Sequence, residues 1–326
     1  MLKNVLRWFD SWYEAEPSVT NSNENKQVQW LRILPFVLLH LACFAVFWVG
    51  ISWFAVVFAV LFYLIRMFSI TAFFHRYFAH KTFETSRVLQ FVFALIGTMS
   101  AQRGPLWWVA HHRYHHRHTD TEQDPHASIH GFWYSHVGWF LNEYNFATRK
   151  AVIKDWLKFP ELVWLDRFSL IVVLATAGLI YTLGQWLAIH YPQLGTSGLQ
   201  LLVWGGAIST VLLLHATLCI NSLAHHYGQR DFETNDQSRN NLFLSIITLG
   251  EGWHNNHHYY AGSTRQGFYW WQIDITYYFL KIMSWLGLVW GLKPIPERVY
   301  LDSKMMQRKK LKMQRLKRNI QSQESS

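Results

Sequence analysis

Long apolar stretches alternate with polar, histidine-rich segments along this chain of 326 residues. The first apolar stretch covers residues 33–74 and contains a single charged side chain, Arg66. One membrane-spanning helix needs about 20 residues, so a stretch of twice that length predicts two helices that fold back near Gly50. A second apolar pair, residues 169–188 and 199–221, flanks a polar turn over residues 191–198. The pattern predicts an all-α integral membrane protein with four transmembrane helices in two hairpins.

Three other apolar stretches are too short or too charged to cross a membrane. They cover residues 88–102, 156–167 and 275–291, and the last carries Lys281 near its middle. We expect all three to form helices that lie in or under the lipid headgroup layer. The alternative for the last stretch is a fifth span, which would place the basic tail on the opposite face of the membrane.

The distribution of lysine and arginine predicts the orientation in the membrane. Apart from Arg66, these residues lie before residue 33, between residues 76 and 167, or after residue 229. The turns between the paired spans contain none. Because basic loops stay on the cytoplasmic side, the N-terminus, the histidine-rich segments and the C-terminus are expected to share the cytoplasmic face.

The chain therefore divides into three parts. Residues 1–30 form a cytosolic N-terminal segment, residues 31–294 a membrane domain with four spans and a cytosolic helical cap, and residues 295–326 a basic tail. We expect the tail to be a solvated, membrane-attracted helix or a disordered end. The net charge of +10 needs no nucleic acid partner to explain it. Cys43 and Cys219 both lie in predicted spans, which indicates no disulfide framework and a reducing compartment.

Histidine is concentrated in three clusters at this face. The clusters are His75 with His80, then His112, His115 and His116, then His254, His257 and His258. One ion takes about four to six ligands, so eight clustered imidazoles indicate two metal ions held in the cap. Residues three and four apart share a helix face, so each HxxHH cluster is expected to present three nitrogens on one side. His75 and His80 are five apart, so we expect the chain between them to bend or to leave the helix.

Carboxylates near the clusters are suited to orient the rings, because a ligating histidine usually donates its other ring N–H to an acceptor. The candidates are Asp120, Glu122, Asp124 and Glu251. We expect the isolated residues His40, His190 and His215 to be hydrogen-bonded core residues. The surface or a position behind the ligands is expected for His118, His126, His130 and His136.

The chemistry that such a site supports best is oxidative. No cysteine nucleophile, Ser/His/Asp grouping, phosphate loop or dinucleotide motif accompanies the clusters. A redox-active pair of ions that faces hydrocarbon can activate dioxygen against a C–H bond, whereas zinc is not redox-active. The nearest alternative is a related hydroxylase. The alternative from another class is a metal-ion transporter, which requires ligands near the membrane midplane rather than at one face.

Further motifs carry a specific resemblance. They are Asp124-Pro-His126, Gly131-Phe132, Ser135-His-Val-Gly-Trp139, Asn221-Ser-Leu-Ala-His225 and Gly250-Glu-Gly-Trp-His254. With the three clusters they resemble the membrane fatty acid desaturases of the acyl-CoA Δ9 (stearoyl-CoA) type. The resemblance implies an O2-dependent enzyme that introduces a cis double bond, at Δ9, into a saturated acyl chain at two Fe ions. It implies nine histidine ligands and Asn221 bound through a water, the histidines being His75, His80, His112, His115, His116, His225, His254, His257 and His258.

The resemblance also implies a tunnel for the acyl chain. The family bends this tunnel at the irons with a Gln, a Trp and a Thr, and the matching positions are Gln102, Trp108 and Thr217. The same match places Tyr63 near the closed end, with Met67 one turn further on, where the animal enzymes carry a small residue. We therefore expect regioselectivity like that of the family and a shorter acyl chain.

Two features bear on the partners. Before the second cluster this chain has Ala110-His111 where the animal acyl-CoA enzymes have Arg-Asp, so an acyl-CoA, another acyl thioester and an acyl lipid are all substrate candidates. No cytochrome b5-like or flavin motif is present, so a separate ferredoxin, cytochrome b5 or reductase is expected to supply electrons. The short form resembles bacterial members, which predicts the bacterial inner membrane with both termini and the active site in the cytoplasm.

Overall fold

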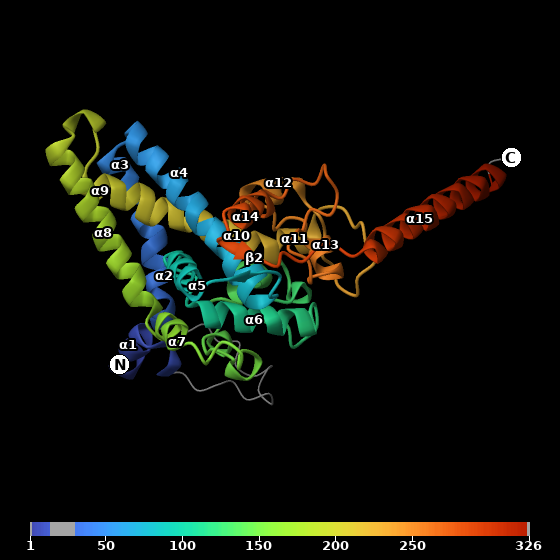
Figure 1. The fold of residues 1–326 in the computed structure, drawn as a ribbon, viewed down its shortest axis with the longest axis horizontal. Helices are drawn as coiled ribbons and strands as arrows, with labels where there is room; N and C mark the ends of the chain where they lie inside the picture. The colour runs from blue at the N-terminus through green and yellow to red at the C-terminus, as the bar shows by residue number, and fades with distance from the viewer. Residues whose placement is uncertain (1, 14–29, 325–326) are drawn as a thin grey trace.

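The computed structural model describes residues 2–13 and 30–324. Long apolar helices form one part and a compact cap forms the other, and the last helix projects away from both (Figure 1). The apolar part contains α2 (Trp30–Ala42), η3 (Cys43–Ala45), α3 (Val46–Val49), α4 (Trp53–Phe68), η4 (Ser69–Ala79), α8 (Ser169–His190), η9 (Pro192–Leu194), α9 (Gly198–Leu201), η10 (Leu202–Ile208) and α10 (Ser209–Asn221).

The remaining elements build the cap and the two ends of the described chain. The cap contains β1 (Glu84–Thr85), α5 (Arg87–Thr98), α6 (Pro105–His118), η5 (Ser128–His130), η6 (Tyr134–Gly138), η7 (Glu143–Asn145), η8 (Lys150–Val152), α7 (Pro160–Arg167), α11 (Leu223–His226), α12 (Leu242–Ile247), α13 (His254–Tyr259), α14 (Ile275–Trp285) and β2 (Val289–Trp290). The N-terminal helices are α1 (Leu2–Phe9) and η1 (Ser11–Tyr13), and α15 (Glu297–Glu324) is the last helix.

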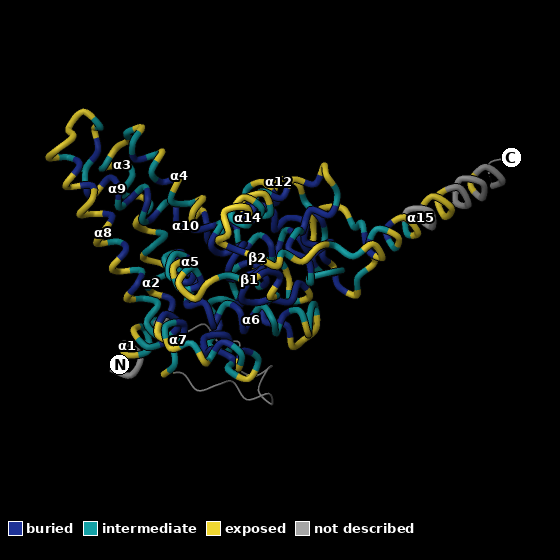
Figure 2. Tube along the Cα trace, in the orientation of Figure 1, coloured by how far each residue is buried: buried dark blue, intermediate teal, exposed yellow. Residues whose placement is uncertain are grey.

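Three helices in the described part of the chain are long and apolar enough to cross a membrane: Trp53–Ala79, Ser169–His190 and Gly198–His226. The stretch before Gly50 is also apolar and helical, but it is shorter, Ile33–Val49, and the 3-10 turn η3 interrupts it. In the second hairpin α8 packs along α9 and η10, whereas α2 and α4 each pack against η10. Exposed segments alternate with buried ones along α8 (Figure 2).

Both chain reversals occur where the sequence predicts them. Gly50 has a φ of 66°, in the left-handed region that favours glycine. Ser52 then caps α4, because its Oγ accepts a hydrogen bond from the Ala55 amide at 3.2 Å. In the second hairpin the helices approach so closely that a Cβ on Gly184 would lie 2.6 Å from the carbonyl oxygen of Ser197.

Arg66, the one charged side chain inside the first apolar stretch, faces the protein interior and is 1% exposed. Its guanidinium donates to Thr210 Oγ1 at 2.6 Å, to Ser209 Oγ at 2.8 Å and to the Met99 carbonyl oxygen at 3.1 Å. A buried charge is tolerated when hydrogen bonds replace its water shell. Arg66 therefore joins α4 to α10 inside the apolar part.

The segment between His75 and His80 stays helical, so the expectation of a bend or a break is wrong. α4 continues directly into η4, a π-helix of 11 residues that are all buried. A π-helix pairs residue i with residue i+5, and the His80 amide nitrogen lies 3.2 Å from the His75 carbonyl oxygen. The wider turn places both rings on one side, with ring centroids 4.9 Å apart.

The three stretches predicted to lie at the membrane surface form the helices α5, α7 and α14. The strands β1 and β2 pair antiparallel, with Glu84 opposite Trp290, and tie the start of α5 to the end of α14. The core beneath them contains fully buried side chains such as Phe73, Phe78 and Leu162. Each of the three helices also exposes a large apolar side chain, namely Val88, Trp164 and Trp285 respectively.

The N-terminal helices and the start of the last helix are both anchored to the cap. At the N-terminus, Trp12 Nε1 donates to Asp166 Oδ2 at 2.6 Å, and the rest of the predicted N-terminal segment, residues 14–29, lies outside the described residues. The basic tail is a helix of 28 residues that projects from the cap (Figure 1). Its first turns are fixed by a 2.5 Å hydrogen bond from Tyr259 Oη to Asp302 Oδ2 and by the buried side chain of Val299.

Candidate metal centre

Two helices carry the HxxHH clusters, and the sequence around each explains its position. α6 begins with Pro105, which needs no hydrogen-bond partner for its nitrogen at a helix start. In α13 the two asparagines between the histidines anchor the helix to the cap. Asn255 Nδ2 donates to the Phe232 carbonyl oxygen at 3.1 Å, and Asn256 Nδ2 donates to Gln272 Oε1 at 2.8 Å. The histidines on the other side of α13 are thereby directed toward α6.

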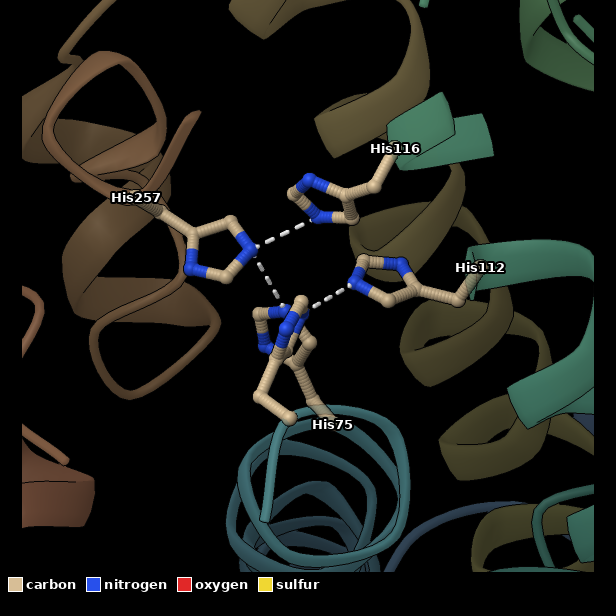
Figure 3. A group of neighbouring side chains, drawn as sticks. His75, His112, His116 and His257 are labelled. Atoms are coloured by element: carbon tan, nitrogen blue, oxygen red, sulfur yellow. Dashed lines mark hydrogen bonds between the residues drawn. The ribbon is translucent and has the colours of Figure 1, made fainter. Parts of the chain in front are cut away.

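The nine histidines of the sequence analysis meet in two groups. The first histidine group contains His75, His80, His112, His116 and His257, and the second contains His115, His225, His254 and His258. Within each group the facing ring nitrogens all lie within 4.8 Å of one another. Figure 3 shows His112 and His116 of α6 converging with His75 of η4 and His257 of α13. The shortest contacts join Nε2 atoms, at 2.8 Å for His80 with His112 and 3.0 Å for His225 with His254.

Each HxxHH cluster divides between the two groups, so the expectation of three nitrogens on one side is wrong. Adjacent residues of an α-helix are about 100° apart around its axis, so His115 and His116 point to different groups. His112 and His116, four apart, share the first group. α13 divides in the opposite sense, with its first and last histidines in the second group and His257 in the first. Each of the two helices therefore contributes to both groups.

Carboxylates hold the outer nitrogen of four rings. Nδ1 of His115 lies 2.9 Å from Asp124 Oδ2, Nδ1 of His225 lies 3.2 Å from Asp120 Oδ2, and Nδ1 of His258 lies 2.9 Å from Asp236 Oδ2. Nδ1 of His75 contacts the Glu251 carboxylate. An ionised carboxylate only accepts hydrogen bonds, so it keeps the proton on Nδ1 and leaves the Nε2 lone pair directed into the group.

Three of the four carboxylates predicted for this role occupy it, and Glu122 does not. Its side chain is 65% exposed, and its carboxylate lies 3.5 Å from His130 Nε2. The chain turns sharply at Asp120, which has a φ of 56°. Asp120 and Asp124 face inward, and residues 121–123 between them, which include Glu122, are exposed. Asp236 takes the fourth place. It lies 22 residues before His258, and the sequence analysis missed it. In the structure the Asp236 carboxylate also accepts a hydrogen bond from the Ser238 amide.

Burial sets the ionisation of the site. It lowers the pKa of His80, His112, His116, His254 and His257 well below the usual value, because the charged form loses its water. Burial also lowers the pKa of His258 to about 4, although the hydrogen bond that this ring donates to Asp236 opposes the shift. For Asp120, burial opposes ionisation, but hydrogen bonds from His225, Ser128 and the Gln237 amide outweigh it and lower the pKa. Neutral rings beside ionised carboxylates are the state that a metal ion requires.

A cation fits the space between the rings. The Nε2 atoms of His115 and His258 lie 3.4 Å apart, and a carboxylate holds Nδ1 of each ring. With both rings neutral, two lone pairs face each other with no proton between them. Although burial lowers the pKa of His115, the Asp124 charge raises it overall, so positive charge is favoured at this place. Nitrogens about 3 Å apart match neighbouring ligands at about 2.1 Å from one ion, and imidazole ligands favour transition metals over Ca²⁺ or Mg²⁺.

A buried ion-pair network that the sequence analysis missed supports Glu251. Arg76 is 1% exposed, and its Nη2 lies 3.3 Å from Glu251 Oε1 while its Nη1 lies 2.9 Å from Asp274 Oδ1. Gly250 passes directly against this pair with a φ of 132°, and a Cβ there would lie 2.5 Å from Asp274 Oδ1. The glycine before Glu251 therefore permits the close approach that fixes the carboxylate behind His75.

A cavity of ≈ 40 Å³, the first cavity, reaches both histidine groups. Histidines of both groups line it, together with Met67, Ile70, Trp108, Thr217 and Asn221. The three residues predicted to hold the tunnel bend meet beside it. Gln102 Nε2 donates to Thr217 Oγ1 at 3.0 Å, and Trp108 stacks on His112 with ring centroids 5.0 Å apart. Tyr63 packs beside Met67, and its hydroxyl donates to the Ile247 carbonyl oxygen at 2.7 Å.

Three histidines outside both groups form a separate hydrogen-bonded chain. Nε2 of His40 lies 3.0 Å from Nε2 of His215, and Nδ1 of His215 lies 3.0 Å from Nε2 of His136. The chain continues from His136 Nδ1 to Ser222 Oγ at 2.9 Å. The prediction of hydrogen-bonded histidines is confirmed for His40 and His215, and it is wrong for His190, which is exposed and contacts the Trp186 ring.

Comparison with known proteins agrees with this arrangement. Residues 51–281 match the family model described as fatty acid desaturase. The chain is 36% identical over 298 residues to an acyl-CoA 5-desaturase of Anemone leveillei, which covers 85% of this chain and 86% of that protein. It is 36% identical over 270 residues to an sn-1 stearoyl-lipid 9-desaturase of Anabaena variabilis (82% and 94%), and 35% identical over 268 residues to an sn-2 palmitoyl-lipid 9-desaturase of Nostoc sp. (80% and 89%).

Each of these matches extends over most of this chain and most of the relative. The family model alone covers the helix α4, all three histidine clusters and most of α14. The matched region contains every residue of the two histidine groups and of the first cavity. The protein is therefore an oxidoreductase that desaturates fatty acyl chains, and the chain belongs to the fatty acid desaturase family.

Proposed function

We propose that the protein introduces a cis double bond at the Δ9 position of a saturated fatty acyl chain. In the balanced reaction, R–CH2–CH2–R′, O2, two electrons and two protons give R–CH=CH–R′ and two waters. The first cavity carries this proposal, because apolar side chains and histidines of both groups line the same space. Several relatives are named 9-desaturases, which supports the position of the double bond.

Two iron ions suit the two histidine groups. The first group would hold one ion with five imidazoles, and the second group would hold the other with four. When bound, the irons supply the redox chemistry that activates dioxygen, which zinc does not provide. Asp120, Asp124 and Asp236 keep the ring protons on Nδ1, so the Nε2 atoms stay available as ligands. Asn221 ends α10 at the first cavity and is suited to hold a water beside the second group.

The position of the double bond follows from a bent acyl chain. Gln102, Trp108 and Thr217 would hold the bend next to His112. The hydrogen bond from Gln102 to Thr217 and the stacking of Trp108 on His112 support this role. With the carboxyl end held at one side of the bend, the reacting carbons are counted from that end. Met67 lines the first cavity and Tyr63 closes the space behind it, so this pair would set the length of chain that is accepted.

The membrane topology consistent with this reaction has four spans, a cytosolic cap and cytosolic termini. The helical stretch from Trp30 to Val49 would be the fourth span, because it rises about 30 Å, the thickness of the hydrocarbon core. Its outer side chains support this role, with Phe47 80% and Trp48 81% exposed. α5, α7 and α14 would rest in the headgroup layer on their exposed apolar side chains. The bacterial inner membrane is the proposed location.

The reaction requires partners that bring the acyl chain and two electrons. The substrate would be a fatty acyl thioester or an acyl lipid, and relatives of both kinds are named, as acyl-CoA and as acyl-lipid desaturases. A separate ferredoxin, cytochrome b5 or reductase would supply the electrons one at a time.

Acyl-chain profiling tests the proposed function. The wild-type protein and the His116→Ala variant are expressed in a host without Δ9 desaturase activity, and total acyl chains are analysed by mass spectrometry. We expect cis-Δ9 monounsaturated chains only with the wild-type protein. Hydroxylated chains in their place, or an unchanged profile from iron-loaded wild-type protein supplied with a reductase, would contradict the proposal.

A further inference from the structure

A cavity of ≈ 520 Å³ lies in the cap, between the start of α12 and the segment before α14. We call it the cap cavity. Four aromatic side chains line it, namely Phe243, Trp253, Tyr269 and Trp271. Asp231 is the only charged residue among the described residues that line it. The cap cavity and the first cavity share none of their described lining residues, so the cap cavity is a separate space.

The carboxylate of Asp231 is fixed at the wall of the cap cavity through one of its two oxygens. Asn240 Nδ2 donates to Asp231 Oδ2 at 2.8 Å, and Gln272 Nε2 donates to the same oxygen at 3.2 Å. Asn256 of α13 holds both amides from behind: it accepts from Asn240 Nδ2 at 2.7 Å and donates to Gln272 Oε1 at 2.8 Å. Within the described residues, neither a donor nor a cation is paired with Asp231 Oδ1. That oxygen and the negative charge are therefore available to a ligand.

Aromatic rings beside a carboxylate favour an ammonium group as the ligand. The face of an aromatic ring attracts a cation, and the carboxylate adds an opposite charge. Trp271 stacks on Tyr269 with ring centroids 4.7 Å apart, which holds both rings in place. The cation–π contacts of the cap use other rings, such as Arg265 over Tyr277. A primary ammonium also donates a hydrogen bond to Asp231 Oδ1, which a quaternary ammonium cannot do.

Two arginines beside the cap cavity are suited to the phosphate of a phospholipid. Arg239 Nη1 donates to the Gly228 carbonyl oxygen at 3.4 Å, and Arg265 Nη2 donates to the Tyr269 carbonyl oxygen at 2.7 Å. Gly228 and Tyr269 both line the cavity. A guanidinium pairs well with a phosphate. The carboxylate and the arginines together match a headgroup that carries both an ammonium and a phosphate.

The apolar surroundings of the cap cavity indicate that this headgroup comes from the membrane. Phe243 and Trp271 at the cavity are 68% and 56% exposed, and the neighbouring Trp270 is 81% exposed. Large exposed apolar side chains continue along α14 to Trp285, and α12 packs against α10, the end of a candidate span. Figure 2 shows exposed segments on both α12 and α14. An exposed aromatic patch that continues from the spans is typical of the membrane–water interface.

We propose that the cap cavity binds the headgroup of a zwitterionic phospholipid with a primary ammonium group, such as phosphatidylethanolamine. The ammonium lies against Asp231 Oδ1 and the Trp271 ring, and the phosphate lies near Arg239. This lipid is distinct from the acyl substrate, because the two cavities are separate. Asn256 lies between the histidines of α13, so the bound headgroup also stabilises the amide network that anchors this helix. The inference concerns binding alone and does not rest on the proposed function.

Native mass spectrometry of the purified full chain tests the proposal. The protein in detergent is incubated with equal amounts of phosphatidylethanolamine and phosphatidylglycerol that have the same acyl chains, and the retained lipids are counted. Phosphatidylglycerol has the phosphate but no ammonium, so we expect the wild-type protein to prefer phosphatidylethanolamine. In Asp231→Asn the amide oxygen still accepts from Asn240 and Gln272, but the NH2 group replaces the free oxygen and repels the ammonium. This variant should lower the preference about 3- to 10-fold.

Trp271→Leu gives a second, independent variant, and it should lower the preference about 2- to 5-fold by removing the ring face. The matched controls are Glu122→Gln and Trp285→Leu. They make comparable changes at an exposed carboxylate and an exposed tryptophan that do not line the cap cavity. Both controls should keep the wild-type preference. Melting curves without added lipid verify that each variant is folded.

Thermal unfolding with added ligand separates a lipid from a free amine, because a ligand that binds the native state raises the melting temperature. Phosphatidylethanolamine should raise the melting temperature of the wild-type protein more than that of Asp231→Asn, whereas phosphatidylglycerol should affect both alike. Equal stabilisation by free ethanolamine would assign a soluble amine and overturn the lipid source. Equal retention of phosphatidylcholine would contradict the hydrogen bond to Asp231 Oδ1. If Asp231→Asn and Trp271→Leu both keep the wild-type preference, or the wild-type protein prefers phosphatidylglycerol, the inference is wrong.

Discussion

Replacing Asp236 by Asn should weaken the binding of the proposed metal ion by the second histidine group. Asp236 Oδ1 accepts hydrogen bonds from the Ser238 amide at 2.9 Å and from Thr234 Oγ1 at 2.9 Å, and Oδ2 faces His258 Nδ1 at 2.9 Å. In the variant, the amide oxygen keeps the two donors and the NH2 group turns toward His258. Because two N–H donors repel each other, His258 moves its proton to Nε2, and that nitrogen stops being a ligand.

The magnitude follows from the loss of one oriented imidazole. Removing the partner behind a ligating histidine typically weakens metal binding about 10- to 100-fold, or about 1.4 to 2.7 kcal/mol. His258 belongs to the group with four imidazoles, so the effect should fall on one of two irons per chain. Competition with a graded series of iron chelators measures both affinities in one titration.

Glu122→Gln is the matched control. It makes the same chemical change at a carboxylate that the sequence also nominated, but that side chain is 65% exposed and lies away from both groups. We expect the control to hold both irons like the wild-type protein. If Asp236→Asn also holds two irons with wild-type affinity, the account of how the rings are oriented is wrong.

Four further predictions concern the site and the spans. His116→Ala should abolish alkene formation while the protein still fractionates with membranes, because insertion depends on the apolar helices; full desaturation in a membrane assay would contradict the first histidine group. Asn221→Ala should lose about 10- to 100-fold in activity yet retain both irons in metal analysis, and loss of one iron equivalent would show a more direct role. Tyr63→Ala should extend the accepted chain length without moving the double bond, counted from the carboxyl carbon by mass spectrometry; a bond that keeps its distance from the methyl end would refute the tunnel direction. Gly184→Ala should lower stability by about 1–3 kcal/mol in thermal unfolding, because the new Cβ meets Ser197, whereas Gly178→Ala, with no atom within 4 Å of its Cβ, should not.

Apolar length and local turn chemistry were enough to predict the chain reversals. The first apolar stretch is too long for one span, and Gly50 is the residue where a left-handed φ is least costly. The second reversal follows the polar residues between α8 and α9. The weak point is the stretch before Gly50, because a prediction from hydropathy cannot detect the 3-10 turn at Cys43 that interrupts the first predicted span.

Clustering along the sequence predicted eight of the nine histidines in the two groups, and the resemblance supplied His225, but neither predicted how the histidines divide. The 100° step between His115 and His116 matters only when a second helix crosses α6 with its own histidines, and that crossing is a tertiary property. The π-helical register between His75 and His80 likewise depends on packing, since all residues of η4 are buried. Asp236 reaches His258 across 22 residues of chain, and no pattern near either residue marks the pair.

Product analysis of the reconstituted enzyme tests the central claim most directly. The purified protein is loaded with iron in lipid vesicles, supplied with a reductase, dioxygen and a saturated acyl substrate, and the products are analysed by mass spectrometry. The account predicts a product with two hydrogens fewer than the substrate and a cis double bond between the ninth and tenth carbons from the carboxyl end. A product that instead retains an oxygen atom as a hydroxyl group would contradict it.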